Sequence, residues 1–285
     1  MIHYETQGAR SQSGRSDEPF HRYVFDDGTV WTEFYRDGDN YLLRFPGLAD
    51  FQVSADGMNV TAWPAEDADT ATIDHLYINQ LVPLALSRQG RPAFHASVVS
   101  VPGGAVAFLG ATGSGKSTLA ASYALADGAF LTDDSLVVEE TANACVAQPS
   151  HASLRLWEDS VAALVGANTM KSTTVSYSSK TRLLAGDALA YNNQPCRLLA
   201  AFKLGEGKPE GVTIYKLNGL ERYMAWLRNS FLLDVEDRDL LARHFEWTHR
   251  ISGRVPTFTL DYPRDYAMLA NVRERVAEHL LTIED

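Results

Sequence analysis

The spacing of apolar and polar residues divides the chain into regions with different predicted structure. Residues 1–20 are polar and rich in Ser, Gly, Gln and Arg, so we predict a flexible lead that starts to fold near Phe20. From Tyr23 to Trp63, short runs of aromatic and β-branched residues are separated by Asp-Gly pairs. Asp-Gly supplies the positive φ that tight hairpins need, so this region is predicted to be an antiparallel β meander.

A helical period follows the meander. Apolar residues recur at steps of three and four from Ile73 to Ala85, which predicts an amphipathic helix that ends near Gly90. Thr70 or Thr72 is the candidate N-cap. The meander and this helix together form a predicted N-terminal module over residues 21–90.

Strands and helices alternate beyond Pro92, which predicts an α/β domain over residues 91–285. Its expected strands and helices, in chain order, are strands 93–101 and 105–109, helix 116–126, strands 129–131, 136–139, 198–204 and 212–217, helices 219–231 and 237–251, strand 257–261 and helix 265–281. The predicted fold class is therefore α/β, with a mixed sheet flanked by helices and a small β module before it.

Composition and charge exclude several classes of protein. The chain has 285 residues, of which 45% are hydrophobic, so it can bury a large core. Its formal net charge of −11 argues against a nucleic acid or an anionic membrane as partner. The chain has only two cysteines, which do not indicate a disulfide framework. We find neither a secretory signal nor an apolar run of membrane-spanning length, and expect a cytoplasmic protein.

One motif carries explicit chemistry. Residues 110–117 read Gly-Ala-Thr-Gly-Ser-Gly-Lys-Ser, which fits G-x-x-x-x-G-K-[ST] between a predicted buried strand and a predicted helix. Glycines let the backbone approach a phosphate closely, and the helix N-terminus favours its negative charge. Lys116 is expected to reach the β- and γ-phosphates of a nucleotide, and Ser117 to ligate Mg²⁺. The predicted nucleotide-binding residues of the loop are Gly110, Ala111, Thr112, Gly113, Ser114, Gly115, Lys116, Ser117 and Thr118.

Three further side chains narrow the chemistry. Asp133 and Asp134 follow the apolar run 129–131, so they should emerge at the carboxyl end of a strand, where ligands bind in open α/β sheets. One carboxylate can support Mg²⁺ while the other accepts a proton from an attacking hydroxyl; the alternative is a pair of solvated turn residues. His95 lies 21 residues before Lys116. A single histidine in an apolar strand is usually an ordinary packed or surface residue, so His95 by itself does not indicate a functional role.

The spacing of His95, the glycine-rich loop and the Asp pair resembles that in HPr kinase/phosphorylase, a serine kinase whose P-loop core is related to phosphoenolpyruvate carboxykinase. The resemblance covers about residues 93–160. It implies that Asp133 is the general base toward a serine hydroxyl, that His95 orients this carboxylate, that Asp134 supports the metal with Ser117, and that ATP and Mg²⁺ are the cofactors. It also implies a homo-oligomer, hexameric in the relatives.

The sequence departs from that family at two points. The Glu-Val-Arg-Gly signature is replaced by Ser153-Leu154-Arg155-Leu156, which keeps only the Arg, so phosphorolysis is not expected. The usual N-terminal regulatory domain is replaced by the β module. This module and the segment around Arg155 resemble stand-alone HPr-kinase-like proteins of peptide biosynthetic clusters, including those for lasso peptides, which implies a precursor peptide as one candidate substrate.

The predicted function is an ATP-dependent kinase acting on a serine or other hydroxyl of a peptide or small protein. Two alternatives stay open, a kinase for a small molecule on the same core and a nucleotide-gated binding protein with little catalysis. The guanine-reading Asn-Lys-x-Asp motif and the Leu-Ser-Gly-Gly-Gln motif of transporter ATPases are absent from the sequence.

A few other side chains could belong to the site. Arg155 is expected either to clamp a phosphate or the substrate backbone, or to be an exposed strand residue or a partner of Glu158 or Asp159. Lys180 and Arg182 are candidates for a lid over the phosphates, or plain surface residues. The tryptophans expected to belong to the core are Trp157, Trp226 and Trp247.

Overall fold

The computed structural model describes residues 2–25, 27–126, 128–166, 169–172, 175 and 179–283. The described chain divides into two compact units. The first contains the residues up to Arg91 together with Val175 and Phe231–His244, and the second contains the remainder from Pro92 onward. Each unit has its own hydrophobic core, so each is described by itself.

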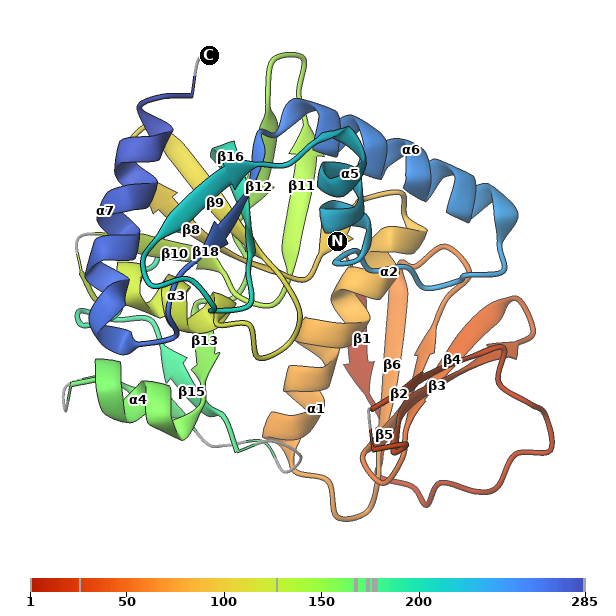
Figure 1. Cartoon of the computed structure of the whole chain (residues 1–285). Helices are drawn as coiled ribbons and strands as arrows, with labels where there is room; N and C mark the ends of the chain where they lie inside the picture. Colours follow the sequence, from red (N-terminus) through yellow and green to blue (C-terminus); the bar gives the residue numbers. More distant parts are fainter. Residues whose placement is uncertain are drawn as a thin grey trace. The chain divides into compact units, whose positions relative to one another are not determined.

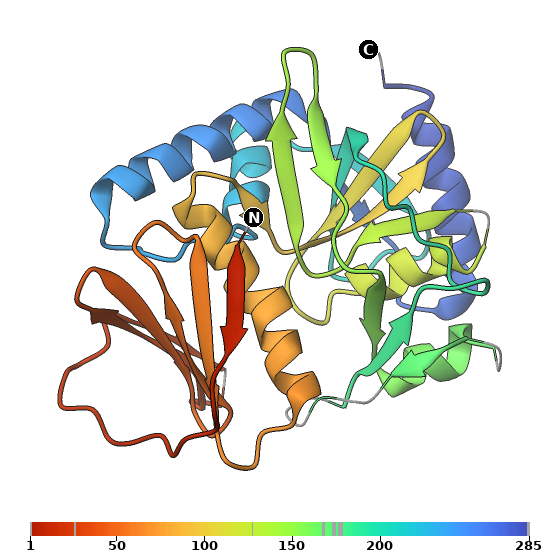
Figure 2. The same ribbon diagram turned by 180° about the vertical axis from the view of Figure 1, so that it is seen from behind.

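The first unit is built on a six-stranded sheet with the order β1-β6-β5-β4-β3-β2 (Figure 1). Strands β2 to β6 form the expected antiparallel meander, and β1 pairs in parallel with β6 (Figure 2). The strands are β1 (His3–Thr6), β2 (His21–Val24), β3 (Val30–Asp37), β4 (Asn40–Phe45), β5 (Ala49–Val53) and β6 (Asn59–Pro64).

A helical segment covers one face of this sheet. It consists of α1 (Thr70–Leu76), a π-helical turn η1 (Tyr77–Leu81) and α2 (Val82–Arg88), whose apolar side chains pack on those of the strands. The N-cap is Asp69, whose carboxylate accepts the Thr72 amide. The prediction of Thr70 or Thr72 as the cap is therefore wrong, because the helix begins immediately after a better-placed acceptor.

The prediction of a flexible lead over residues 1–20 is wrong for the residues that form β1. Tyr4 stacks on Tyr77 with ring centroids 3.6 Å apart, and Gln12 donates to the Asp50 carboxylate at 2.9 Å. These contacts join positions about 40 to 70 residues apart, so the local composition of the segment does not reveal them.

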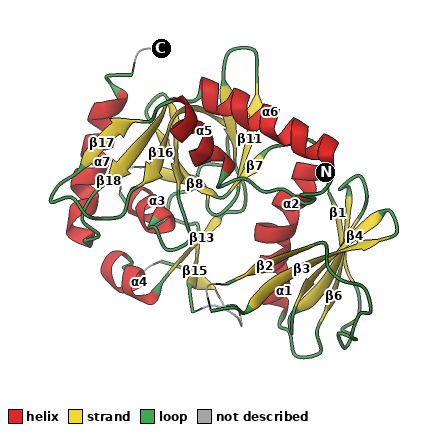
Figure 3. Ribbon diagram, turned by 45° about the vertical axis from the view of Figure 1, so that its right-hand side comes forward, coloured by secondary structure: helices red, strands yellow, loops and turns green. Residues whose placement is uncertain are grey.

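The second unit has a mixed nine-stranded sheet, which confirms the predicted α/β class (Figure 3). Strands β9, β16 and β18 are parallel to one another, whereas β8 is antiparallel to both β9 and β10. The strands of this sheet are β7 (Ala93–Phe94), β8 (Ala96–Val101), β9 (Gly104–Leu109), β10 (Ala129–Thr132), β11 (Leu136–Glu140), β12 (Cys145–Gln148), β16 (Cys196–Leu204), β17 (Thr213–Lys216) and β18 (Thr257–Asp261).

Helices pack on both faces of this sheet, so its central strands β8 and β9 are buried on both faces. Val106 and Phe108 of β9 face a core shared with α3 and α7, whereas Ala107 and Leu109 face a core that contains Trp226 of α5. The helices of the unit are α3 (Lys116–Ala124), α4 (Glu158–Leu164), α5 (Gly219–Leu227), α6 (Arg238–Arg254), which begins in the first unit, the short η2 (Tyr266–Met268) and α7 (Leu269–Leu280).

The expected strand 93–101 is interrupted at His95. Ala93 and Phe94 pair with β11, whereas Ala96 onward pairs with β9, so the chain changes partners at the histidine. A separate small sheet, ordered β13-β15-β14 and not predicted from the sequence, comprises β13 (Ser153–Leu156), β15 (Thr181–Leu184) and β14 (Lys171–Ser172). Among the described residues, no helix is long and apolar enough to cross a membrane.

Candidate functional site

Three strand ends meet at one edge of the second unit's sheet. Ala96, the first residue of β8, pairs with Leu109, the last residue of β9, and Thr132 at the end of β10 pairs with Val98. The glycine-rich loop, His95 and the Asp pair directly follow or precede these ends. The sheet register therefore brings together groups that lie up to 39 residues apart in the sequence.

The loop at 110–115 has the backbone conformation that its glycines permit. Gly113 and Gly115 have φ values of 82° and 95°, and Gly115 is the N-cap of α3. A Cβ on Gly110, whose φ is 149°, would lie 2.8 Å from the Ser114 hydroxyl oxygen. A side chain at these positions would strain or crowd the loop, so the glycines are needed for its shape.

Several polar groups of the loop have no partner within the described part of the chain. The backbone N–H groups of Gly113, Gly115 and Lys116 make no hydrogen bond there, and neither does the buried Ser114 hydroxyl. Successive amides of this kind at a helix N-terminus form a concave site for an anion. The residues present therefore fit the phosphates of a nucleotide.

Lys116 is the buried cation of this loop. It is 4% exposed, and its ammonium donates to the carbonyl oxygens of Gly110 at 2.7 Å and Ala111 at 3.0 Å. Burial lowers the pKa of Lys116 to about 8, although the charges of Asp134 and Asp133 oppose the shift. The hydrogen-bond partners of the ammonium are neutral carbonyl oxygens, and a bound phosphate would give it a negatively charged partner in direct contact.

The two aspartates have different surroundings. Asp133 is 2% exposed and accepts the Ser97 hydroxyl at 2.6 Å and the Arg155 amide at 3.1 Å. Burial and the neighbouring Asp134 charge raise the pKa of Asp133, and hydrogen bonds, one of them from Ser117, oppose this shift. Asp134 has a φ of 66°, which turns its side chain away from that of Asp133 toward the pocket.

His95 contacts Asp134 from the start of β8. Its Nδ1 lies 3.2 Å from the Asp134 carbonyl oxygen and 3.9 Å from the Asp134 carboxylate. Burial lowers the pKa of His95, and the charge of Lys116 lowers it further. The imidazole is therefore neutral at pH 7, and its two nitrogens can act as one donor and one acceptor.

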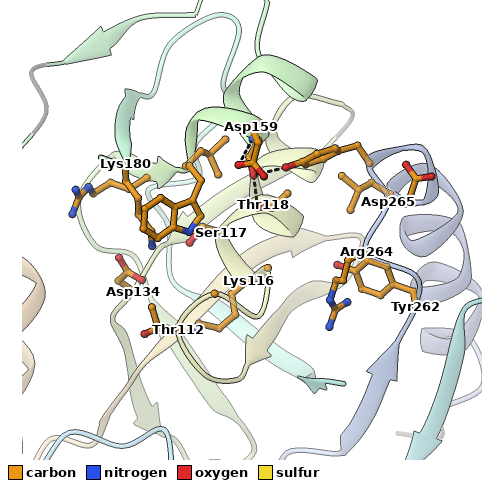
Figure 4. Close-up of a pocket in the computed structure, with 18 of the residues that line it drawn as sticks. Thr112, Lys116, Ser117, Thr118, Asp134, Asp159, Lys180, Tyr262, Arg264 and Asp265 are labelled. Atoms are coloured by element: carbon orange, nitrogen blue, oxygen red, sulfur yellow. Dashed lines mark hydrogen bonds between the residues drawn. The ribbon is translucent and has the colours of Figure 1, made fainter. Parts of the chain in front are cut away.

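These groups line one pocket of about 230 Å³ (Figure 4). Lys180, Ser117 and Asp134 lie on one side of it, whereas Tyr262, Arg264 and Asp265 lie on the other. The predicted residues that line it are His95, Thr112, Gly113, Gly115, Lys116, Ser117, Thr118, Asp134 and Arg155. The other predicted residues, Gly110, Ala111, Ser114 and Asp133, are described by the structure but do not line it.

The second side of the pocket is aromatic. The Arg264 guanidinium lies 4.4 Å from the ring centroid of Tyr262. Tyr266 is 3.1 Å from the Ser160 hydroxyl, which is itself 3.1 Å from the Thr118 hydroxyl. A chain of hydroxyls thus connects the start of α3 to this wall. No sequence pattern predicted that these residues belong to the site, because they come from segments far apart in the chain.

Two tryptophans differ in their burial. Trp226 is fully buried, as predicted. Trp157 is 43% exposed and lines the pocket, so the prediction that it belongs to the core is wrong. It directly precedes α4, and its position at a strand end leaves the indole half in solvent. Arg155, in contrast, is only 7% exposed, so the alternative of an exposed strand residue does not hold.

Asn229 supports the site without having been predicted. Its side-chain oxygen accepts the Gly110 amide at 3.2 Å, and its backbone oxygen accepts the His95 amide. Asn229, which follows the C-cap of α5, therefore fixes both the beginning of the loop and the backbone of His95. A lone Asn at the end of a helix carries no signal of this role in the sequence.

The described residues contain no cluster of three or more His, Cys, Asp or Glu side chains that could by itself hold a metal ion. The oxygen groups near the loop are the Ser117 hydroxyl, which hydrogen-bonds to the Asp133 carboxylate beneath the pocket, and the Asp134 carboxylate, which lines the pocket. Oxygen donors suit Mg²⁺, which commonly takes only one or two protein ligands and completes its shell with phosphate and water. The donor set therefore fits Mg²⁺ brought with a nucleotide.

Comparisons with known proteins give little beyond this. A scan against protein-family models found no match, and a search of curated proteins found none either. Among solved structures, the HPr(Ser) kinase/phosphatase from Coxiella burnetii is similar at 12% identity over 56% of this chain and 97% of that chain, with a TM-score of 0.27. The likeness is weak at this TM-score, so the residues of the site carry the functional proposal.

Proposed function

We propose that the protein is an ATP-dependent kinase that transfers the γ-phosphoryl group to a hydroxyl of a peptide or small protein. The observation that carries this proposal is the juxtaposition, in one pocket, of an unpartnered amide cradle with Lys116 and of the Asp134–His95 pair. A cradle alone would support nucleotide binding. A carboxylate beside it supports chemistry on the bound phosphate.

The loop provides the donor site. In this proposal, the amides of Gly113, Gly115 and Lys116 bind the β-phosphate, and the Lys116 ammonium leaves the loop carbonyls to contact the β- and γ-phosphates. The aromatic side with Tyr262 and Tyr266 receives the nucleoside. Ser117 would hold Mg²⁺, which would neutralise part of the charge on the phosphates.

The geometry favours Asp134 rather than Asp133 as the general base, the reverse of what the family resemblance implies. Asp134 lines the pocket, whereas both oxygens of Asp133 accept hydrogen bonds beneath it. Asp133 is better placed to orient the Ser117 hydroxyl toward a metal. His95 beside Asp134 would orient that carboxylate and stabilise its protonated form by hydrogen bonding.

The transfer balances with these groups. The acceptor oxygen forms a bond to the γ-phosphorus as the bond from that phosphorus to the β–γ bridging oxygen breaks. The hydroxyl proton passes to the Asp134 carboxylate, and ADP leaves with the electron pair.

The net charge of −11 suits a neutral or basic peptide as acceptor better than an acidic protein. A homo-oligomer, as in HPr kinase relatives, belongs to this proposal.

The test is transfer of radiolabelled γ-phosphate from Mg-ATP to an array of serine-containing and threonine-containing peptides. We expect labelled products with the wild-type protein and transfer that is at least about 100-fold slower with Lys116→Ala or Asp134→Asn. Asp133→Asn should retain residual transfer that higher Mg²⁺ or Mn²⁺ restores in part, since its role is in holding the metal. Asp239→Asn, an exposed change at the start of α6, is the matched control.

Three results would count against the proposal. Full transfer by Asp134→Asn would remove the assigned base. Tight binding of Mg-ATP without any labelled peptide or small molecule would favour the nucleotide-gated binding protein, and labelling confined to small molecules would favour the other alternative.

A further inference from the structure

A lysine enters the pocket from a part of the fold that is separate from the glycine-rich loop. Leu156 at the end of β13 pairs with Thr181 at the start of β15. This register places Lys180 and Trp157, each one residue beyond the pair, next to each other at the end of the small sheet. Both line the pocket.

Trp157 holds Lys180 in a defined position. The Lys180 ammonium lies 5.2 Å from the centre of the indole ring, within the range in which a cation is attracted to an aromatic face. An exposed lysine normally samples many rotamers. Contact with the indole ring reduces that freedom and keeps the charge at the pocket that both residues line.

Lys180 lies at the end of the pocket that contains Asp134, the proposed general base. In Figure 4 it lies on the side of Asp134 and Ser117, opposite Arg264 and Tyr262. Burial is the main cause that lowers the pKa of Lys116 and of His95, and the charge of Lys180 adds to it against the opposing charge of Asp134, so the three basic groups are close enough to interact. The two lysine ammonium groups would both attract a polyanion bound between them.

We propose that Lys180 binds the terminal phosphate of the nucleotide, opposite Lys116, and that Trp157 is its positioning residue. The inference rests on the proposed function. Lys116 at the start of α3 reaches the β- and γ-phosphates from below the loop, whereas Lys180 approaches from the small sheet, at the end away from the aromatic wall. A diphosphate would end before Lys180, so this contact distinguishes ATP from ADP.

The experiment compares the affinities of Mg-ADP and of a non-hydrolysable Mg-ATP analogue by titration calorimetry. Lys180→Met keeps the length of the side chain and removes its charge. We expect about tenfold weaker binding of the triphosphate and less than twofold change for ADP, as for one charged hydrogen bond. Lys180→Arg should keep most of the preference. Lys171→Met, at an exposed position of β14, should change neither affinity.

Trp157 is tested by the same ratio. Trp157→Ala should reduce the preference for the triphosphate, and adding it to Lys180→Met should cause little further loss, because both act through one contact. A merely structural tryptophan would weaken both nucleotides alike.

The outcomes separate the two proposals. Equal losses for ADP and the triphosphate in Lys180→Met, or no loss for either, would overturn the role of Lys180 and leave the kinase proposal standing. If the wild-type protein binds neither nucleotide, the proposed function is wrong, and the role of Lys180 with it.

Discussion

Buried aspartates of the two units differ in their partners and in the direction of their pKa shifts. In the first unit, the fully buried Asp234 carboxylate accepts Arg36 at 3.0 Å and Tyr41 at 2.9 Å. Burial alone would raise the pKa of Asp234, but the hydrogen bonds, that of Arg36 foremost, hold it below its usual range. Asp50 is likewise paired with Arg44 at 2.8 and 2.9 Å, and its pKa is also lowered.

Asp133 of the second unit is as buried as Asp50, but has no ion pair with a lysine or arginine among the described residues. Its pKa is raised, because burial and the Asp134 charge outweigh its hydrogen bonds. A carboxylate that is paired with arginine stabilises the fold, whereas the buried Asp133, which has no such pair in the described chain and lies beside a second negative charge, costs stability. Retaining the second arrangement is typical of a functional site.

The largest expected effect separates the two regions by activity. Asp134→Asn should lower the rate of phosphoryl transfer by about 10²–10⁴-fold, because the general base is lost. Its free energy of unfolding should stay within about 1 kcal/mol of wild type or rise, since repulsion with Asp133 is removed. Transfer assays and urea unfolding measure the two quantities. A large loss of stability would mean that Asp134 is also a structural carboxylate.

The next effect has the opposite character. Asp234→Asn should reduce the free energy of unfolding by about 2–3 kcal/mol, because a buried charged hydrogen bond to Arg36 is lost. Nucleotide affinity of the folded protein should not change. Denaturant unfolding and calorimetry test this, with Asp239→Asn as the surface control. An unchanged unfolding midpoint would contradict the structural role assigned to Asp234.

A pH titration extends the comparison to cations. Lys116 has a pKa of about 8 in the free protein, and phosphates would raise it in the complex. The ammonium is thus mostly protonated at pH 7, and protonating it costs binding energy at higher pH. Affinity for Mg-ATP should fall up to about tenfold from pH 7 to pH 9. Binding that stays constant over this range would show that Lys116 titrates elsewhere.

The smallest effect concerns the rim of the Asp50 pair. Arg10 contacts Asp50 at 3.4 Å, but its side chain is 45% exposed. Arg10→Ala should therefore cost less than about 1 kcal/mol of unfolding free energy, whereas Arg44→Ala, at an 11% exposed side chain, should cost about 2–3 kcal/mol. Equal losses measured by urea unfolding would show that burial does not set the strength of these pairs.

Local sequence signals predicted many of the elements that position the site. The strand 105–109, the loop and the helix from Lys116 follow from an apolar run, closely spaced glycines and a helical period, all of which act between near neighbours. The small sheet β13-β15-β14 escaped prediction because its strands are short and their pairing is distant. Strand β1 escaped for the same reason, since its partner lies 56 residues away.

The candidate site divides in the same way. The sequence by itself determined the glycine-rich loop, Lys116, Ser117, the Asp pair and, through their spacing, His95. Only the tertiary structure decided which aspartate faces the pocket, because Ser97 and Arg155 on other strands hold the Asp133 carboxylate by hydrogen bonds, whereas the chain turns at Asp134 with a positive φ. The sequence indicates a motif when the motif depends on neighbouring residues. The pairing of strands, the burial of a side chain and its orientation depend on contacts between segments that are distant in the chain.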